Sequence, residues 1–248
     1  MTDITAIGEI LIDLTQTGTN EAGVPIFAAN PGGAPANAAV SAARLGAKTA
    51  FLGKAGRDNF GSYLRQVLEE NGVIHTGLRT GSEPTTMAIV SVDRNGERDF
   101  RFLRGADCTL APEEIDLAAV EQTKILHFGS VSLTQGISRS ATIFAARSAH
   151  RSGTLVSYDP NYRASLWKNE REAVEWMLIP LPLVDIIKLS DEELSLLTGT
   201  SDLEKGSRIL ADQGIALVLV TLGSEGSFCR WQGDTFTVSG VPTRVADT

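Results

Sequence analysis

Paired glycines followed by an asparagine form the first segment that could bind a ligand. Gly32 and Gly33 precede a helix that the Ala-rich stretch from Ala34 to Leu45 predicts, and Asn37 falls on its first turn. Glycine lets backbone N–H groups approach a ligand closely, and the start of a helix adds unpaired N–H donors. The Asn37 amide offers a donor and an acceptor to a hydroxyl group. The segment predicts a site for a small polar ligand; a tight loop before a packed helix is the alternative.

A second candidate segment, Asp159-Pro160-Asn161-Tyr162-Arg163, follows the apolar run from Leu155 to Tyr158. Because the proline ring fixes φ and removes an N–H donor, Pro160 can hold the residues after it rigidly. If the run is a strand of a parallel sheet, Asn161 and Arg163 point into the crevice at its carboxyl end. An ordinary strand-exit turn is the alternative for Asp-Pro-Asn alone.

Two later segments follow apolar runs and begin a helix or a turn. Ser190-Asp191-Glu192-Glu193 opens a predicted helix, and Thr221-Leu222-Gly223-Ser224-Glu225-Gly226 leaves an apolar run. Ser-x-x-Glu is also a capping box, in which hydroxyl and carboxylate accept hydrogen bonds from N–H groups at a helix start. A capping role does not exclude a further role for Glu193, so both stay open. The sequence lacks G-x-x-x-x-G-K-[ST], which excludes a P-loop kinase.

Together these segments resemble the signature motifs of the ribokinase-like (pfkB) carbohydrate kinases. The motifs run along the whole chain: Gly8-Glu9-Ile10-Leu11-Ile12-Asp13, Pro31-Gly32-Gly33 with Asn37, Arg44-Leu45-Gly46, Gly53-Lys54-Ala55-Gly56-Arg57-Asp58, Asp159-Pro160-Asn161-Tyr162-Arg163 and Val220-Thr221-Leu222-Gly223. Tyr162-Arg163 resembles fructokinases and 2-keto-3-deoxygluconate kinases in particular. The resemblance implies ATP-dependent phosphorylation of a primary hydroxyl of a sugar. Among sugars, we expect fructose as the substrate, with 2-keto-3-deoxygluconate as the alternative.

The resemblance also implies roles for single residues. Substrate contacts are expected from Asp13, Gly32, Gly33, Asn37, Arg104, Asp159, Asn161 and Arg163, with Asp13 accepting hydrogen bonds from sugar hydroxyls. ATP contacts are expected from Ser190, Thr221, Gly223 and Gly226, and Glu193 is expected to organise Mg²⁺ through water. Ser190 stands where the family has Asn, which leaves Glu193 in register. A solvated side chain is the alternative for Arg104.

The last residues, Val245-Ala246-Asp247-Thr248, resemble the opening of the family's D-T-T-G-A-G-D motif. The resemblance implies that Asp247 helps to bind a monovalent cation such as K⁺. It places the anion-hole glycines and the general-base Asp directly after Thr248. We therefore expect the 248 residues alone to be close to inactive.

Strand-length apolar runs alternate with helix-compatible segments in the order that positions these motifs. Continuous runs predict buried strands, and apolar spacing of three and four residues ending at glycine predicts helices. The predicted strands are residues 4–14, 124–128, 155–158, 184–189 and 216–221, and the predicted helices are 34–45, 58–70, 138–152, 170–177, 191–197 and 203–213. This alternation predicts a doubly wound α/β fold. The resemblance specifies it as a ribokinase-like three-layer α/β/α sandwich with a mostly parallel sheet, a single domain over residues 1–248.

Two segments interrupt the alternation. Residues 85–93 and 97–102 have strand composition and are joined across Asn95-Gly96, a strong hairpin signal. With the polar segment 15–27, the region 85–104 predicts a small β-sheet lid over the crevice, able to exclude water. The resemblance implies a homodimer formed through this lid. Residues 227–231 and 235–238 predict another hairpin.

Composition excludes several classes of protein. A net charge of −8 argues against nucleic-acid binding, which depends on many Lys and Arg side chains. Prolines and glycines interrupt the longest uncharged stretch, so no membrane contact is expected. Two distant cysteines fit a reducing cytoplasm, and three scattered histidines have no metal-ligand spacing.

Two other classes of function are alternatives. A non-catalytic sugar-binding module would use the Asp13 side of the crevice without binding nucleotide. A Rossmann dehydrogenase is disfavoured, because no G-x-G-x-x-G follows the first strand.

Overall fold

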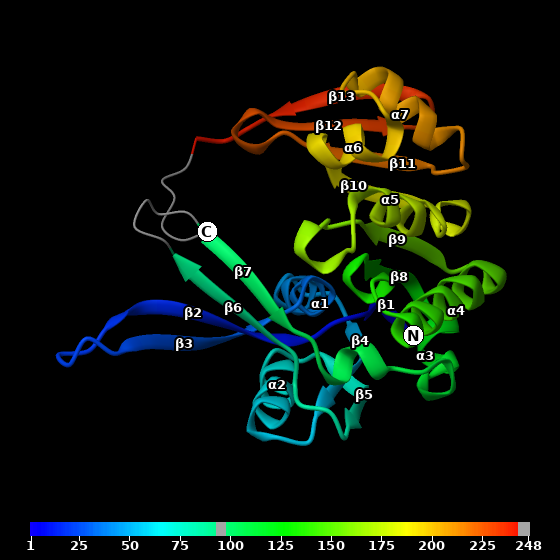
Figure 1. Cartoon of the computed structure of the whole chain (residues 1–248). Helices are drawn as coiled ribbons and strands as arrows, with labels where there is room; N and C mark the ends of the chain where they lie inside the picture. The colour runs from blue at the N-terminus through cyan, green and yellow to red at the C-terminus, as the bar shows by residue number, and fades with distance from the viewer. Residues whose placement is uncertain (93–97, 243–248) are drawn as a thin grey trace.

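The computed structural model describes residues 1–92 and 98–242. Within these residues, nine strands form one mixed sheet in the order β13-β12-β11-β10-β9-β8-β1-β4-β5 (Figure 1). Neighbours from β5 to β11 pair in parallel, whereas β12 and β13 pair antiparallel. The strands are β1 (Thr2–Ile7), β4 (Thr49–Gly56), β5 (Ile74–Gly81), β8 (Thr123–Gly129), β9 (Leu155–Asp159), β10 (Ile186–Ser190), β11 (Leu217–Thr221), β12 (Gly226–Trp231) and β13 (Asp234–Ser239).

The chain leaves the central strand β1 in both directions, toward β5 and toward β11, as a doubly wound sheet does. Because crossovers are right-handed, the connecting helices of the two halves lie on opposite faces. The helices are α1 (Ala34–Arg44), α2 (Asn59–Glu70), α3 (Leu117–Glu121), α4 (Gly136–Ser152), α5 (Glu170–Leu178), α6 (Asp191–Thr198) and α7 (Leu203–Ala211). Short 3-10 turns span Ala106–Thr109, Pro112–Glu114, Val131–Leu133, Ala164–Leu166, Leu181–Leu183 and Gly223–Glu225.

Two hydrophobic clusters show that both faces of the sheet are covered around β1 and β4. Successive residues of a strand point to opposite faces. Ile7 and Leu52 accordingly pack in a cluster with α4, whereas Ala6 and Phe51 pack in a second cluster with α1 and α2. The predicted doubly wound α/β fold is therefore confirmed.

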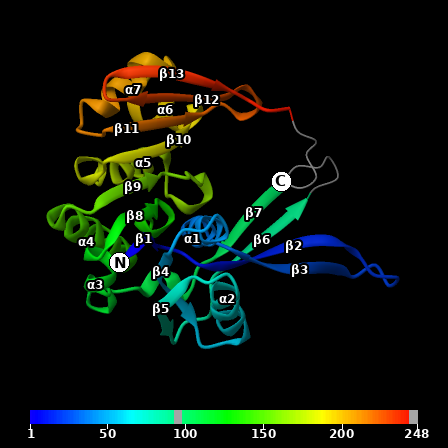
Figure 2. The same ribbon diagram turned by 180° about the vertical axis from the view of Figure 1, so that it is seen from behind.

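A second sheet of four strands stands away from the first (Figures 1 and 2). It contains β2 (Leu11–Thr19), β3 (Pro25–Gly32), β6 (Met87–Val92) and β7 (Arg98–Leu103), in the order β3-β2-β6-β7. The segments 15–27 and 85–104 both contribute strands to it. The Asn95-Gly96 turn lies outside the described residues, but β6 and β7 pair antiparallel on either side of it.

The first predicted strand, residues 4–14, is wrong as a single element. The structure divides it into β1 and β2, which belong to different sheets and are joined by Gly8, Glu9 and Ile10. Gly8 has φ +150°, and a Cβ there would lie 2.7 Å from Pro35 Cγ. Glycine thus lets the chain leave the large sheet and enter the small one close to the start of α1.

Sequence analysis also missed β4, β5 and the short helix α3. Gly53 and Lys54 interrupt the apolar run of β4, and Gly77 lies within β5. Glycine within a strand weakens its composition signal, so tertiary pairing decides these elements. Helix α1 ends one residue before its predicted end, and α2 starts one residue after its predicted start.

Candidate functional site

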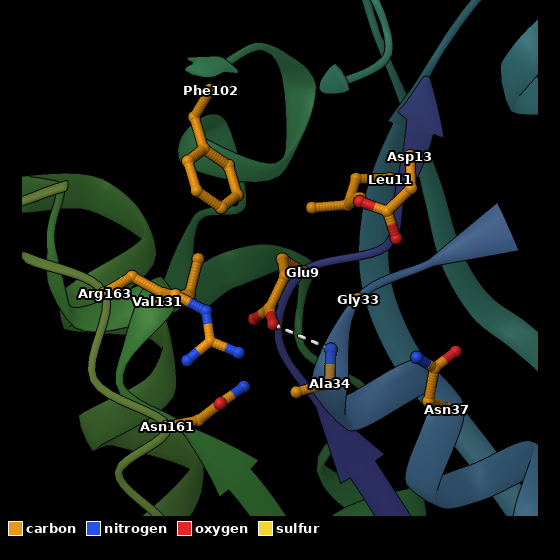
Figure 3. A pocket seen from close by; sticks show the side chains of 10 residues that line it. All are labelled: Glu9, Leu11, Asp13, Gly33, Ala34, Asn37, Phe102, Val131, Asn161 and Arg163. Atoms are coloured by element: carbon orange, nitrogen blue, oxygen red, sulfur yellow. Dashed lines mark hydrogen bonds between the residues drawn. The ribbon is translucent and has the colours of Figure 1, made fainter. Parts of the chain in front are cut away.

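A cavity of about 170 Å³ lies where β1 ends, between the two sheets (Figure 3). Its volume is about six times the share of one water molecule in the liquid, so it suits a small ligand. The lining residues come from five separate regions of the sequence: Glu9, Leu11, Asp13, Gly33, Ala34, Asn37, Phe102, Val131, Asn161 and Arg163. Five predicted substrate residues, Asp13, Gly33, Asn37, Asn161 and Arg163, therefore meet at one cavity.

Asp13 lies on β2, and its position depends on the glycine opposite. A Cβ on Gly32 would lie 2.1 Å from Asp13 Oδ2, so only glycine leaves room for this carboxylate. Burial raises the pKa of Asp13, and the positive charge of Arg163 opposes that rise. Gly32 thus acts on the site by giving space to Asp13.

The start of α1 forms a second wall. Gly33 is its N-cap with φ 104°, and no side chain of its own caps the helix. A Cβ on Gly33 would lie 2.5 Å from the Glu9 carbonyl oxygen. The Glu9 carboxylate takes over the capping, because its Oε1 accepts a hydrogen bond from Ala34 N at 3.0 Å.

The 159–163 segment forms the wall opposite Asp13. Asn161 has φ 45°, a left-handed conformation that is uncommon outside glycine. Tyr162 N donates to Glu193 Oε1 at 2.6 Å, which ties the segment to the start of α6. Asp159 does not line the cavity; its Oδ2 accepts from Lys188 Nζ at 3.1 Å.

Arg104 does not line the cavity either. Its Nη2 donates to Asp107 Oδ2 at 2.6 Å, and its Nη1 donates to Thr134 Oγ1 at 2.8 Å. Burial alone would lower the pKa of Arg104, but Asp107 raises it above its usual range. The two expected substrate-side arginines thus differ, because Arg163 lines the cavity and Arg104 forms an ion pair with Asp107.

A second cavity of about 380 Å³ adjoins the first, and Asn161 and Arg163 line both. Lys188, Ser190 and Glu193 also line it. The capping box expected at Ser190 is present: Glu193 N donates to Ser190 Oγ at 3.1 Å, and Ser190 N donates to Glu193 Oε2 at 2.8 Å. Both carboxylate oxygens of Glu193 thus accept backbone N–H bonds.

Residues 221–226 turn away from β11 and do not line this second cavity; Leu222 and Glu225 line a further cavity with Asp191 and Glu192. Gly223 and Gly226 have φ of 57° and 111°, conformations that favour glycine. A Cβ on Gly226 would lie 2.0 Å from Val238 O, so the close approach of β13 also requires glycine here. Thr221 ends β11 next to Ser190 at the end of β10. Asp247 lies outside the described residues.

Within residues 1–92 and 98–242, no group of three or more His, Cys, Asp or Glu side chains could hold a metal ion by itself. In the same residues, no helix is long and apolar enough to span a membrane. Cys108 and Cys229 are free thiols.

Glu9 is the lining residue that sequence analysis left without a role. It is only 2% exposed, yet it carries a carboxyl group at the cavity wall. The available signal was a charged residue directly after a buried strand, in a stretch that is otherwise apolar up to Asp13.

Comparison with known proteins identifies the class of protein. Residues 1–248 match the pfkB family carbohydrate kinases, and the chain belongs to this family. Among curated relatives, it is 41% identical over 249 residues to probable fructokinase-4 of Arabidopsis thaliana, covering 98% of this chain and 76% of the relative. It is 40% identical over 253 residues to fructokinase-2 of Solanum lycopersicum, covering 99% of this chain and 76% of that relative.

Solved structures agree in fold. The ATP-bound fructokinase of Xylella fastidiosa superposes with a TM-score of 0.89 at 32% identity, covering 96% of this chain and 78% of that chain. A fructokinase of Vibrio cholerae O395 bound to fructose, ADP and calcium gives a TM-score of 0.89 at 34% identity, covering 100% and 79%. The ribokinase-like fold with a small second sheet is confirmed.

Proposed function

We propose that the protein is an ATP-dependent fructokinase that transfers the γ-phosphoryl group of ATP to the primary hydroxyl at C6 of fructose. The observation that carries the proposal is the cavity at the end of β1, where Asp13, Asn37, Asn161 and Arg163 converge. Carboxylate, amide and guanidinium groups together offer donors and acceptors to a polyhydroxylated ligand. The fructokinases among the relatives and solved structures support this sugar.

The position of Arg104 favours fructose over 2-keto-3-deoxygluconate. Bidentate binding of a substrate carboxylate by two arginines would need Arg104 and Arg163 at one site. Arg104 is instead paired with Asp107, so Arg163 alone remains at the cavity. An uncharged sugar needs no such pair.

The second cavity is the proposed site for the ATP phosphates. Lys188 lines it and offers a positive charge to phosphate groups, whereas the N–H groups of Glu192 and Glu193 already donate to the side chains of Asp191 and Ser190. Glu193 is a suitable partner for Mg²⁺ through water, because its oxygens keep lone pairs beyond the two backbone bonds. Mg²⁺ would neutralise charge on the transferred phosphoryl group. A K⁺ ion near Asp247 and the general-base Asp after Thr248 complete the proposal, following the family motif.

The small sheet is the proposed lid and dimer contact. Its strands β2 and β7 supply Asp13 and Phe102 to the cavity wall, and Ile26 and Phe27 on β3 are 48% and 41% exposed. Closure of the lid would exclude water from the sugar. Sedimentation should show a dimer that Phe27→Asp dissociates; a wild-type monomer would contradict it.

Free thiols at Cys108 and Cys229 suit a reducing compartment such as the cytoplasm.

A coupled assay of ADP release with the full-length protein tests the proposal. We expect turnover with fructose and MgATP at a kcat/KM at least tenfold above that with 2-keto-3-deoxygluconate, since binding of the acid would leave its carboxylate poorly paired. Preference for the acid would reverse the substrate assignment. Sugar binding in calorimetry without any nucleotide binding would instead indicate a sugar-binding module.

A further inference from the structure

The carboxyl group of Glu9 has one oxygen with a structural role and one without. Oε1 accepts the hydrogen bond from Ala34 N that caps α1. Oε2 is buried and has no hydrogen-bond partner among the described residues. Capping of α1 therefore accounts for Oε1 of Glu9 but not for Oε2.

The position of the second oxygen matters because Glu9 lies in the middle of the cavity wall. In Figure 3 one oxygen is on the dashed line to Ala34, and the other faces the side where Arg163 and Asn161 lie. A buried carboxyl oxygen without a partner is costly, since it loses its water and gains no hydrogen bond in return. Such a cost is expected where a ligand supplies the missing partner.

The raised pKa of Glu9 also indicates that burial of its ionised form is unfavourable. Burial raises the pKa of Glu9 to about 7, with the negative charge of Asp107 adding to the rise and Arg104 opposing it. Arg104 is already paired with Asp107, so it does not supply a hydrogen bond to Oε2. None of the described residues therefore forms a hydrogen bond with Oε2 of Glu9.

We infer that Glu9 is a substrate-contacting residue whose Oε2 accepts a hydrogen bond from one hydroxyl group of the bound sugar. The inference rests on the proposed fructokinase function and adds a specificity contact on the side of the cavity where Arg163 and Asn161 lie. No covalent step is involved. Because the sugar hydroxyl donates the hydrogen bond that Oε2 lacks, a sugar without that hydroxyl leaves the carboxylate buried and unpaired.

Calorimetry with fructose and with a set of analogues that each lack one hydroxyl tests the inference. The variant is Glu9→Gln, whose amide oxygen still accepts from Ala34 N while its NH₂ group, which cannot accept, replaces Oε2. At about pH 8 the wild-type carboxyl is mostly ionised, since its pKa is about 7. Asp116→Asn, at the N-cap of α3 away from the cavity, is the matched control.

We expect Glu9→Gln to raise the Kd for fructose by about 10- to 100-fold, as for loss of a hydrogen bond to a charged group. For one analogue, the wild type and Glu9→Gln should bind equally weakly, which identifies the hydroxyl that contacts Oε2. Asp116→Asn should leave all Kd values unchanged.

Two results would overturn the inference: an unchanged Kd for fructose, or an equal rise for fructose and every analogue together with a lower melting temperature, which would indicate capping alone. Failure of the wild type to bind fructose at all would refute the proposed function itself, and with it this contact. Binding of fructose by the wild type separates the two failures.

Discussion

The two halves of the large sheet differ in how they are covered. Around β1, β4 and β8, residues pointing to either face are buried, as Ala6, Ile7, Phe51 and Leu52 show. From β9 to β13, the face that carries Phe228 packs on helices. On the opposite face, Leu155, Trp231, Phe236 and Val238 are 46%, 52%, 50% and 55% exposed.

The two candidate cavities follow this difference. The proposed sugar cavity belongs to the covered half and contains a fully buried carboxyl group at Glu9. The proposed phosphate cavity belongs to the other half and is lined by partly exposed charges such as Lys188. Under the proposal, recognition of an uncharged sugar would depend on buried groups, whereas a highly charged nucleotide would be held by groups that stay near water.

The largest effect should come from truncating a side chain in the covered half. Phe51→Ala removes a fully buried ring and should lower the free energy of unfolding by about 3–5 kcal/mol. Phe236→Ala makes the same change on a half-exposed ring and should cost under about 1 kcal/mol. Urea denaturation of the 248-residue chain measures both. Equal losses would show that the face of β13 is covered in solution.

The pH dependence of stability should distinguish the halves next. The folded pKa of Glu9 is about 7 against an ordinary 4.5, so the folded state holds this proton longer than the unfolded state. Stability from this group is complete below about pH 4.5 and is lost as pH rises through about 7, up to about 3 kcal/mol. Glu9→Gln removes this loss.

Urea titrations of wild type and Glu9→Gln from about pH 4 to pH 8 measure the difference. The free energy of unfolding of Glu9→Gln should rise relative to that of the wild type as pH increases. Parallel curves would mean that Glu9 ionises normally, despite the neighbouring Asp107 and Arg104.

Loss of the Asp13 carboxylate should weaken sugar binding without affecting the other half. Asp13→Asn should raise the Kd for fructose about 100-fold, because charged acceptors make the stronger hydrogen bonds. The Kd for ATP should not change. Since burial raises the pKa of Asp13, the melting temperature of the variant should not fall. Equal weakening of ATP binding would contradict separate sites.

The smallest predicted effect concerns the connection between the halves. Glu193→Ala removes the acceptor for Tyr162 N and Ser190 N, which loosens both the 159–163 segment and the start of α6. We expect the Kd values for fructose and ATP to rise together, each about tenfold. Glu175→Ala, an exposed change on α5, is the control. A change in ATP binding alone would mean that Glu193 does not position the sugar segment.

Much of the fold could be predicted because its signals are local. Ser190, Asp202 and Asn169 cap their own helices through bonds to N–H groups three residues ahead, so the predicted starts of α5, α6 and α7 agree with the structure. The strands β4 and β5 were missed because their glycine-containing sequences depend on partners far along the chain.

The candidate site was predictable in its parts and less so in its arrangement. Asp13, Gly33, Asn37, Asn161 and Arg163 follow recognisable motifs and do meet at one cavity. The position of Arg104 could not be predicted, because it depends on hydrogen bonds to Thr134 and to the Val131 carbonyl, which are distant in the sequence. Which cavity residue contacts which sugar atom stays a prediction.

The sequence alone determined the family and the doubly wound order of the elements, since motifs, apolar runs and helix caps are local properties. The tertiary structure alone decided that the first apolar run divides between two sheets at Gly8, and that Glu9 is left with an unpaired oxygen at the cavity. The physical reason is that burial and hydrogen-bond satisfaction depend on residues brought together from distant parts of the chain.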